Sequence, residues 1–216
     1  METLTQLDEI RQKLGSVELV AVSKTKPVAQ MLELYRQGQR IFGENYVQEL
    51  VEKKNQFDLL GIKDIEFHFI GHLQSNKVKS MLPCVSTIHS IDSVRLYEEV
   101  IKRAEEMKLK ISVYFQINID DEKSKSGFRS SEVTDLAYLV KTRTSPSVRV
   151  IGLMTIPSPE GIPGAAFRKM HELSKRYRSE LGSGLSMGMS NDYEMAIAEG
   201  ATSVRIGSAL FGKRDP

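Results

Sequence analysis

Two cationic side chains stand where predicted strands end, and the first of them is Lys24. In the segment LVAVSKTKP, the alternation of a strand places Val20, Val22 and Lys24 on one face, so the amine continues an apolar surface. A lysine in such a partly dry position loses its proton more easily, and its amine can then attack an aldehyde to form a Schiff base. A solvated surface charge is the alternative interpretation of Lys24.

The second cation, Arg205, lies in the segment SVRIGSALFG. Alternation places Val204 and Ile206 on one face and Arg205 and Gly207 on the other, which predicts a guanidinium directed toward the interior. A buried guanidinium needs a partner. Arg205 therefore pairs with an acidic core residue, reaches solvent or belongs to a binding site.

Small polar residues follow the strand of Arg205 and the predicted strand before it. Gly207 and Ser208 come after Arg205, and Ser190 ends the preceding strand. Backbone N–H groups, hydroxyls and the start of a helix can together bind a phosphate. Ser190 also suits a simple helix cap, a role that is compatible with phosphate binding. These residues predict an anion site close to Arg205.

The elements that must position these residues alternate along the chain. Short runs rich in Val, Ile and Phe are each followed by a longer amphipathic stretch, which predicts alternating strands and helices and a parallel sheet. The predicted strands span residues 19–24, 40–45, 66–72, 87–92, 111–119, 148–156, 184–190 and 203–210. The predicted helices span residues 28–37, 46–57, 94–108, 132–141, 165–181 and 193–199, with a further helix within 1–15.

This alternation predicts an α/β fold, a single (β/α)8 TIM-type barrel that spans residues 1–216 as one domain. An open doubly wound sheet is the alternative. The loop IPSPEGIPG at 156–164 is short enough to be a surface turn, so it predicts no domain boundary. In such barrels the chemistry lies at the carboxyl ends of the strands, and phosphate often binds after strands seven and eight. Ser190, Gly207 and Ser208 are predicted at that place.

Composition and charge exclude several classes of function. Thirty Lys and Arg residues against 28 Asp and Glu give a net charge of +2, too small for the basic field that binds nucleic acid. Basic pairs such as Lys102 with Arg103 and Lys141 with Arg143 are typical of solvated helix faces rather than of an RNA-binding or protein-binding surface. The single cysteine, Cys84, favours a reducing compartment, so we expect a cytoplasmic protein.

The sequence also predicts neither a membrane segment nor a metal site. It contains no apolar run near the roughly 18 to 20 residues that span a bilayer, and residues 1–15 lack the apolar core of a secretory signal. His171 and Glu172 resemble the start of a zinc-protease helix, but Lys175 stands where the second histidine belongs. His68 and His72 share a face of a predicted strand without a cysteine or third histidine nearby.

Seven motifs follow one another in order along the chain: AVSKTKP at 21–27, FGENYVQE at 42–49, HFIGHLQSNK at 68–77, KSGF at 125–128, GLMTI at 152–156, LSMGMSNDYEMAI at 185–197 and VRIGSALFG at 204–212. These motifs resemble those of the PLP homeostasis proteins, a family of small pyridoxal-phosphate-binding proteins related to the N-terminal barrel of alanine racemase. They cover nearly the whole chain, and the fold that the resemblance implies is the barrel of alanine racemase.

The resemblance implies that Lys24 forms the internal aldimine with pyridoxal 5'-phosphate (PLP) and that Arg205 faces the pyridine nitrogen. Ser190, Gly207 and Ser208 match the residues that bind the phosphate. The remaining implied cofactor-binding residues, around the ring or the phosphate, are Asn45 and Ser186. This assignment agrees with the amine and the anion site that the strand ends predict.

The function that the resemblance implies is intracellular PLP homeostasis, with delivery of the cofactor to PLP-dependent apoenzymes and indirect effects on amino-acid and keto-acid metabolism. An always charged guanidinium beside the ring nitrogen weakens the cofactor as an electron sink, so extensive carbanion chemistry is disfavoured. The alternative is a PLP-dependent, racemase-like enzyme. Alanine racemase takes a second catalytic base from a following domain, for which we expect no room here. We therefore expect a monomer without catalytic activity.

Overall fold

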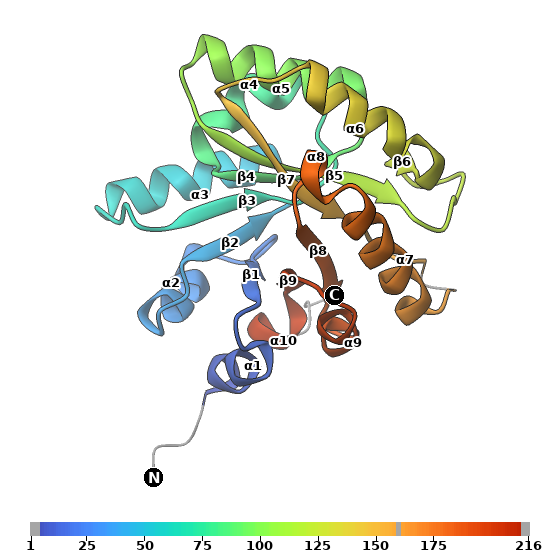
Figure 1. Ribbon diagram of the computed structural model, residues 1–216. Helices are drawn as coiled ribbons and strands as arrows, with labels where there is room; N and C mark the ends of the chain where they lie inside the picture. Colours follow the sequence, from blue (N-terminus) through green and yellow to red (C-terminus); the bar gives the residue numbers. More distant parts are fainter. Residues whose placement is uncertain (1–4, 159–160, 213–216) are drawn as a thin grey trace.

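The computed structural model describes residues 5–158 and 161–212, and within them parallel strands close into a barrel (Figure 1). Each strand pairs with the next around the ring, and β1 closes the ring by pairing with β9. The barrel strands are β1 (Glu18–Val22), β2 (Ile41–Glu44), β3 (Glu66–Phe69), β4 (Thr87–Ile91), β5 (Ile111–Asn118), β7 (Val148–Met154), β8 (Gly184–Met189) and β9 (Ser203–Ile206). The predicted barrel is confirmed, and the open doubly wound sheet is wrong.

Helices surround the sheet on its outer side (Figure 1). The α-helices are α1 (Gln6–Leu14), α2 (Val28–Arg36), α3 (Val47–Leu59), α4 (Val78–Met81), α5 (Val94–Glu106), α6 (Val133–Thr142), α7 (Pro163–Arg176), α8 (Arg178–Leu181), α9 (Tyr193–Ala198) and α10 (Ser208–Phe211). The short elements are the 3-10 helices η1 (Ser75–Lys77), η2 (Leu82–Cys84) and η3 (Ser130–Glu132), and the strand β6 (Phe128–Arg129) beside β5. Within the described ranges, no helix has the length and apolar composition needed to cross a bilayer.

Local sequence explains where several helices begin and end. A reciprocal pair of hydrogen bonds between Thr5 and Asp8 caps α1, which confirms a helix in the described part of residues 1–15. Ser93 Oγ accepts a hydrogen bond from the backbone N–H of Leu96 and caps α5. The predicted helix at 165–181 is instead two helices, α7 and α8, which meet at Tyr177. The predicted loop at 156–164 includes residues 159–160, which lie outside the described residues.

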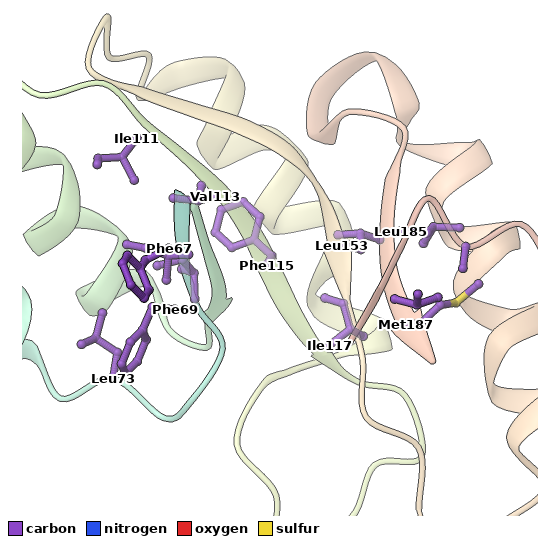
Figure 2. Packing of buried hydrophobic residues seen from close by; sticks show 14 of the residues in the cluster. Phe67, Phe69, Leu73, Ile111, Val113, Phe115, Ile117, Leu153, Leu185 and Met187 are labelled. Atoms are coloured by element: carbon purple, nitrogen blue, oxygen red, sulfur yellow. The ribbon is translucent and has the colours of Figure 1, made fainter. Parts of the chain in front are cut away.

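The apolar core lies between the sheet and the helices rather than inside the barrel. Figure 2 shows side chains of this layer, and the labelled ones include Phe67 on β3, Val113 and Phe115 on β5, Leu153 on β7 and Leu185 on β8. Residues that alternate with the apolar ones along the barrel strands, such as His68, His89 and Ser186, are polar and also buried. Because His89 on β4 hydrogen-bonds Ser186 on β8, two strands that are not neighbours, that contact crosses the barrel lumen.

The predicted strands extend beyond the observed ones, and in three of them the excess changes where a residue of interest lies. β1 ends at Val22, so Lys24 lies in the turn that follows, and β3 ends at Phe69, so His72 lies outside the strand. The segment at 208–210 is helical rather than extended, because the chain turns after Ile206 and α10 begins at Ser208. The apolar residues of α10 pack against the core from the helical layer.

One irregularity shapes β8. Ser186 pairs with Ser203 of β9 and Met189 pairs with Arg205, so β8 advances by three residues where β9 advances by two. The surplus residue is a β-bulge. At Gly188, with φ of +95°, a Cβ would come within 2.6 Å of the Cβ of Ala196 on α9. Only glycine therefore suits this position.

Candidate functional site

A cavity of about 690 Å3 opens at the carboxyl ends of the barrel strands. The residues predicted from the sequence that line it are Lys24, Asn45, Ser190, Arg205, Gly207 and Ser208. They come from the ends of β1, β2, β8 and β9, which are distant in sequence. Ser186, the remaining predicted residue, is fully buried beneath the cavity and does not line it.

Lys24 lies in the turn after β1, where Val22 and Lys24 both line the cavity. The lysine is half-buried, which agrees with the partly dry position predicted for it. The next residue, Thr25, has φ of +63°, a conformation that a β-branched residue rarely adopts. The backbone beside the predicted nucleophile is therefore strained.

Arg205 is only 4% exposed, and its side chain lies in the barrel lumen below the cavity. Its Nη1 donates to Ser186 Oγ at 2.7 Å, and its Nη2 donates to the backbone oxygen of Thr155 at 2.9 Å. Burial lowers the pKa of Arg205 to about 10, and the charge of Asp192 acts against this shift. The guanidinium therefore stays charged at neutral pH.

A chain of hydrogen bonds continues from Arg205 across the lumen. A guanidinium only donates, so Ser186 Oγ accepts from Arg205, and the hydroxyl hydrogen is left to donate to His89 Nδ1, 2.7 Å away. His89 Nε2 lies 3.0 Å from His68 Nδ1. Burial lowers the pKa of His68 to about 4 and that of His89 well below its usual value, so both rings are neutral. We call Arg205, Ser186, His89 and His68 the lumen chain.

The anion side of the cavity is formed by Ser190 and the start of α10. Ser190 Oγ accepts hydrogen bonds from the backbone N–H groups of Gly207 at 3.3 Å and Ala209 at 3.5 Å. These bonds are long, so a phosphate oxygen can take the same donors. Ser208 lines the cavity beside them. The residues predicted to bind an anion thus lie together as a cluster of donors in the cavity that Arg205 also lines.

Asn45 supplies an acceptor on the opposite side of the cavity. Its Oδ1 is buried and has no hydrogen-bond partner among the described residues. Gly71 lets the chain approach this residue closely, because a Cβ there would lie 2.2 Å from the backbone oxygen of Asn45. An unpaired buried acceptor in a cavity wall is suited to a ligand that donates a hydrogen bond.

Sequence reasoning did not find a second polar cluster, which lies behind the Lys24 turn. Lys53 Nζ donates to Glu44 Oε1 and Glu49 Oε1, both at 2.7 Å, and to the backbone oxygen of Ser23 at 2.6 Å. We call Glu44, Glu49 and Lys53 the outer clamp. The motif FGENYVQE contains both glutamates, and Lys53 follows Glu49 by one helical turn, which is the signal that could have found the cluster.

Two further lysines also line the cavity. Lys26 Nζ donates to the backbone oxygen of Phe211 at 3.2 Å, and Lys125 Nζ donates to that of Pro157 at 3.0 Å. Both amines hold segments of the chain at the cavity wall.

His68 and His72, the two histidines considered as ligands of one metal, have separate partners. His72 Nδ1 lies 3.0 Å from Asp92 Oδ2, and His68 contacts His89.

Comparison with known proteins agrees with this geometry. The family described as "Alanine racemase, N-terminal domain" matches residues 4–215. The chain is 42% identical over 204 residues to the pyridoxal phosphate homeostasis protein of Escherichia coli K12, covering 92% of this chain and 86% of that protein. The chain belongs to the PLP homeostasis protein family. The family predicted from the motifs is therefore confirmed.

Solved structures show the same fold. PipY of Synechococcus elongatus PCC7942, determined with PLP bound, is 33% identical and superposes with a TM-score of 0.84, covering 96% of this chain and 98% of that chain. Alanine racemase from Corynebacterium glutamicum superposes with a TM-score of 0.69 at 17% identity and is covered over 59% of its length. The second similarity concerns the barrel fold alone.

Proposed function

We propose that this protein binds PLP covalently through Lys24 and takes part in controlling the free level of the cofactor and its delivery. The observation that supports the proposal best is that Lys24, the Arg205 guanidinium and the donors around Ser190 line one cavity. Membership of the PLP homeostasis family, and the PLP bound in PipY, point to the same ligand.

The residues fit the chemical groups of PLP one by one. The donors of Gly207 and Ala209 suit the phosphate, with Ser190 and Ser208 beside them. The Arg205 guanidinium suits the pyridine nitrogen, which it can only meet as a donor. Asn45 Oδ1 offers an acceptor to a ring hydroxyl. Ser186 acts through Arg205 rather than on the ligand, because its hydroxyl contacts Arg205 and His89.

The covalent step needs no oxidant and no further reactant. The deprotonated Nζ of Lys24 adds to the aldehyde carbon of PLP, a C=N bond replaces the C=O bond, and water leaves. The reaction reverses by hydrolysis or by exchange with another amine. A protein that holds the aldehyde in this way stores it and can release it to a recipient.

The test compares wild type with Lys24→Ala and, as a matched control, Lys26→Ala, which removes another cavity-lining lysine. Each protein is incubated with PLP, freed of nonspecific adducts, reduced with borohydride and mapped by peptide mass. We expect a pyridoxyl group on residue 24 in wild type and in Lys26→Ala, and none at the site in Lys24→Ala. Equal labelling of Lys24→Ala at other lysines contradicts the proposal.

The proposal extends to partners and setting. The recipients are PLP-dependent apoenzymes, the chain acts as a monomer without catalytic activity, and its one cysteine, Cys84, suits the cytoplasm.

Transfer is tested by mixing the PLP-loaded protein with an apoenzyme in the presence of an excess of a reagent that traps free PLP. Recovery of activity that exceeds the recovery with free PLP supports delivery. Exchange of the amino-acid α-hydrogen with solvent deuterium identifies a racemase-like enzyme instead.

A further inference from the structure

The turn that presents Lys24 is held in shape from outside the barrel. Thr25, with φ of +63°, is one of three non-glycine residues in the described chain with a positive φ. A β-branched side chain gains nothing locally from this conformation, so tertiary contacts must impose it. The contact is direct, because the backbone N–H of Thr25 donates to Glu49 Oε1 at 2.6 Å.

Lys53 ties this contact to the rest of the turn. Each of its three N–H bonds has one acceptor: Glu49 Oε1, Glu44 Oε1 and the backbone oxygen of Ser23. Ser23 Oγ also donates to Glu44 Oε1, at 2.6 Å. Both residues that flank Lys24 are therefore bonded to the outer clamp, one through its carbonyl and hydroxyl and the other through its N–H.

The outer clamp lies away from the cavity. The side chains of Lys53 and Glu44 are 6% and 0% exposed, that of Glu49 is 23% exposed, and none of the three residues lines the cavity. Lys53 and Glu49 lie on α3, which follows β2 on the outer side of the sheet. The cluster thus bonds the Lys24 turn at Ser23 and Thr25 from outside the cavity.

We propose that Glu49 and Lys53 are positioning residues that hold the strained turn, so that Lys24 Nζ is directed into the cavity. This inference rests on the proposed function, in which Lys24 is the attachment point for PLP. Without the clamp, Thr25 relaxes toward negative φ, and the direction of the chain at residue 24 changes with it.

The experiment uses the full chain with Glu49→Ala, the conservative Glu49→Gln and the double variant Glu49→Ala with Thr25→Asn. Asparagine adopts positive φ more readily than threonine, so it replaces the action of the clamp by a local preference. Hydrogen exchange of the residue-25 and residue-26 amides is measured in the apo-protein, and the apparent Kd for PLP is measured by titration. Circular dichroism and thermal unfolding confirm that each variant folds.

We expect Glu49→Ala to expose the residue-25 amide to exchange and to weaken PLP binding by about tenfold, the loss expected for one hydrogen bond to a charged group. Glu49→Gln keeps an acceptor oxygen and retains most of the affinity. The Thr25→Asn change restores most of the affinity in the Glu49→Ala background, although it does not restore the hydrogen bond.

Unchanged exchange and unchanged affinity in Glu49→Ala overturn the inference. Lost affinity that Thr25→Asn does not restore also overturns it, because the glutamate then acts otherwise than through the shape of the turn. Failure of the proposed function is distinct from both results. In that case wild type carries no pyridoxyl group on Lys24, whereas the exchange of the apo-protein still reports whether the clamp holds the turn.

Discussion

Arg205 and Lys24 face the same cavity, but different kinds of structure hold them. Arg205 belongs to the lumen chain, in which a single cation is bonded to neutral groups: a serine hydroxyl, a backbone carbonyl and, beyond the serine, two neutral histidines. Lys24 is presented by a strained turn, behind which the outer clamp contains two carboxylates and one ammonium. Arg205 is therefore held by uncharged groups, whereas the Lys24 turn depends on a cluster of charged side chains.

The difference matches what each side chain has to do. A guanidinium that meets a ring nitrogen must keep one orientation and one charge, and hydrogen bonds to neutral buried groups fix both. A lysine that forms and breaks a covalent bond must be brought to the ligand by the backbone that carries it. The clamp bonds the backbone of the residues on both sides of Lys24.

Removal of Glu44 is the change with the largest expected effect, and it tests how far the turn depends on charge. Glu44→Ala leaves the buried Lys53 ammonium with one carboxylate fewer, and we expect a loss of about 3 to 5 kcal/mol in the free energy of unfolding, measured in urea. The double variant Glu44→Ala with Lys53→Met is the control, because it removes the cation as well. A loss below about 1 kcal/mol in Glu44→Ala means that water reaches Lys53 and that the cluster is not dry.

Acid should destabilise the lumen chain. The pKa of His68 is about 4 in the folded protein against 6.5 when unfolded, so between these values the unfolded chain binds more protons and stability falls as the pH is lowered. The difference between the two pKa values corresponds to a loss of about 3 kcal/mol in the free energy of unfolding. His89, with its pKa lowered by burial, acts in the same direction, whereas the pKa of Glu44, raised by burial, acts against it.

The measurement is urea unfolding at several pH values in wild type and in His68→Gln. We expect a smaller dependence on pH in the variant, since its side-chain oxygen can accept from His89 without binding a proton. Equal dependence in both proteins means that folding does not lower the pKa of His68, and the neutral support of Arg205 is then wrong.

Interruption of the lumen chain at Ser186 has an intermediate effect. Ser186→Ala leaves one N–H of Arg205 and one nitrogen of His89 without partners, which costs about 1 to 3 kcal/mol in unfolding free energy. The absorbance of bound PLP should shift as well, because the guanidinium is less well directed. Ser190→Ala serves as the control at a cavity-lining serine that does not contact Arg205. A spectral shift confined to Ser190→Ala contradicts the supporting role of Ser186.

The smallest effect is expected from Thr25→Asn in the wild-type background. Because asparagine tolerates positive φ, the free energy of unfolding should rise by less than about 1 kcal/mol. Thr144→Asn, at an exposed residue without positive φ, is the matched comparison. An effect on stability at residue 25 equal to the effect at residue 144 means that the turn stores no strain.

The succession of strands and helices was sufficient to predict the barrel, and alternation along strands predicted the inward direction of Lys24 and Arg205. The barrel also placed Ser190 and Gly207 together, because strands that are neighbours in a barrel end at the same edge. The strain at Thr25 was not predictable, since the local preference of threonine opposes it and the contact with Glu49 comes from another element. Lys53 has the pattern of a solvated helix lysine, and its burial depends on Glu44 from another element.

The lumen chain was missed for a similar reason. His68 and His89 come from different strands, and Ser186 lies almost a hundred positions beyond His89, so no local spacing connects them. Ser186 was predicted around the ring or the phosphate, whereas its buried hydroxyl contacts Arg205 and His89, because a strand pattern gives the face of a residue and not its depth. The extent of β9 was overestimated because Ser208–Leu210 have an apolar pattern that suits a strand as well as one helical turn.

The bulge in β8 has a consequence for how this site tolerates changes in chain length. The surplus residue sends two successive residues, Met187 and Gly188, toward the helices, and Met189 and Ser190 then line the cavity. Deletion of one residue at Gly188 would restore strict alternation and shift the remaining segment by one position. Ser190 would then no longer meet the N–H of Gly207, although every residue type needed for phosphate binding would still be present. A single-codon deletion at Gly188 is therefore expected to remove the site.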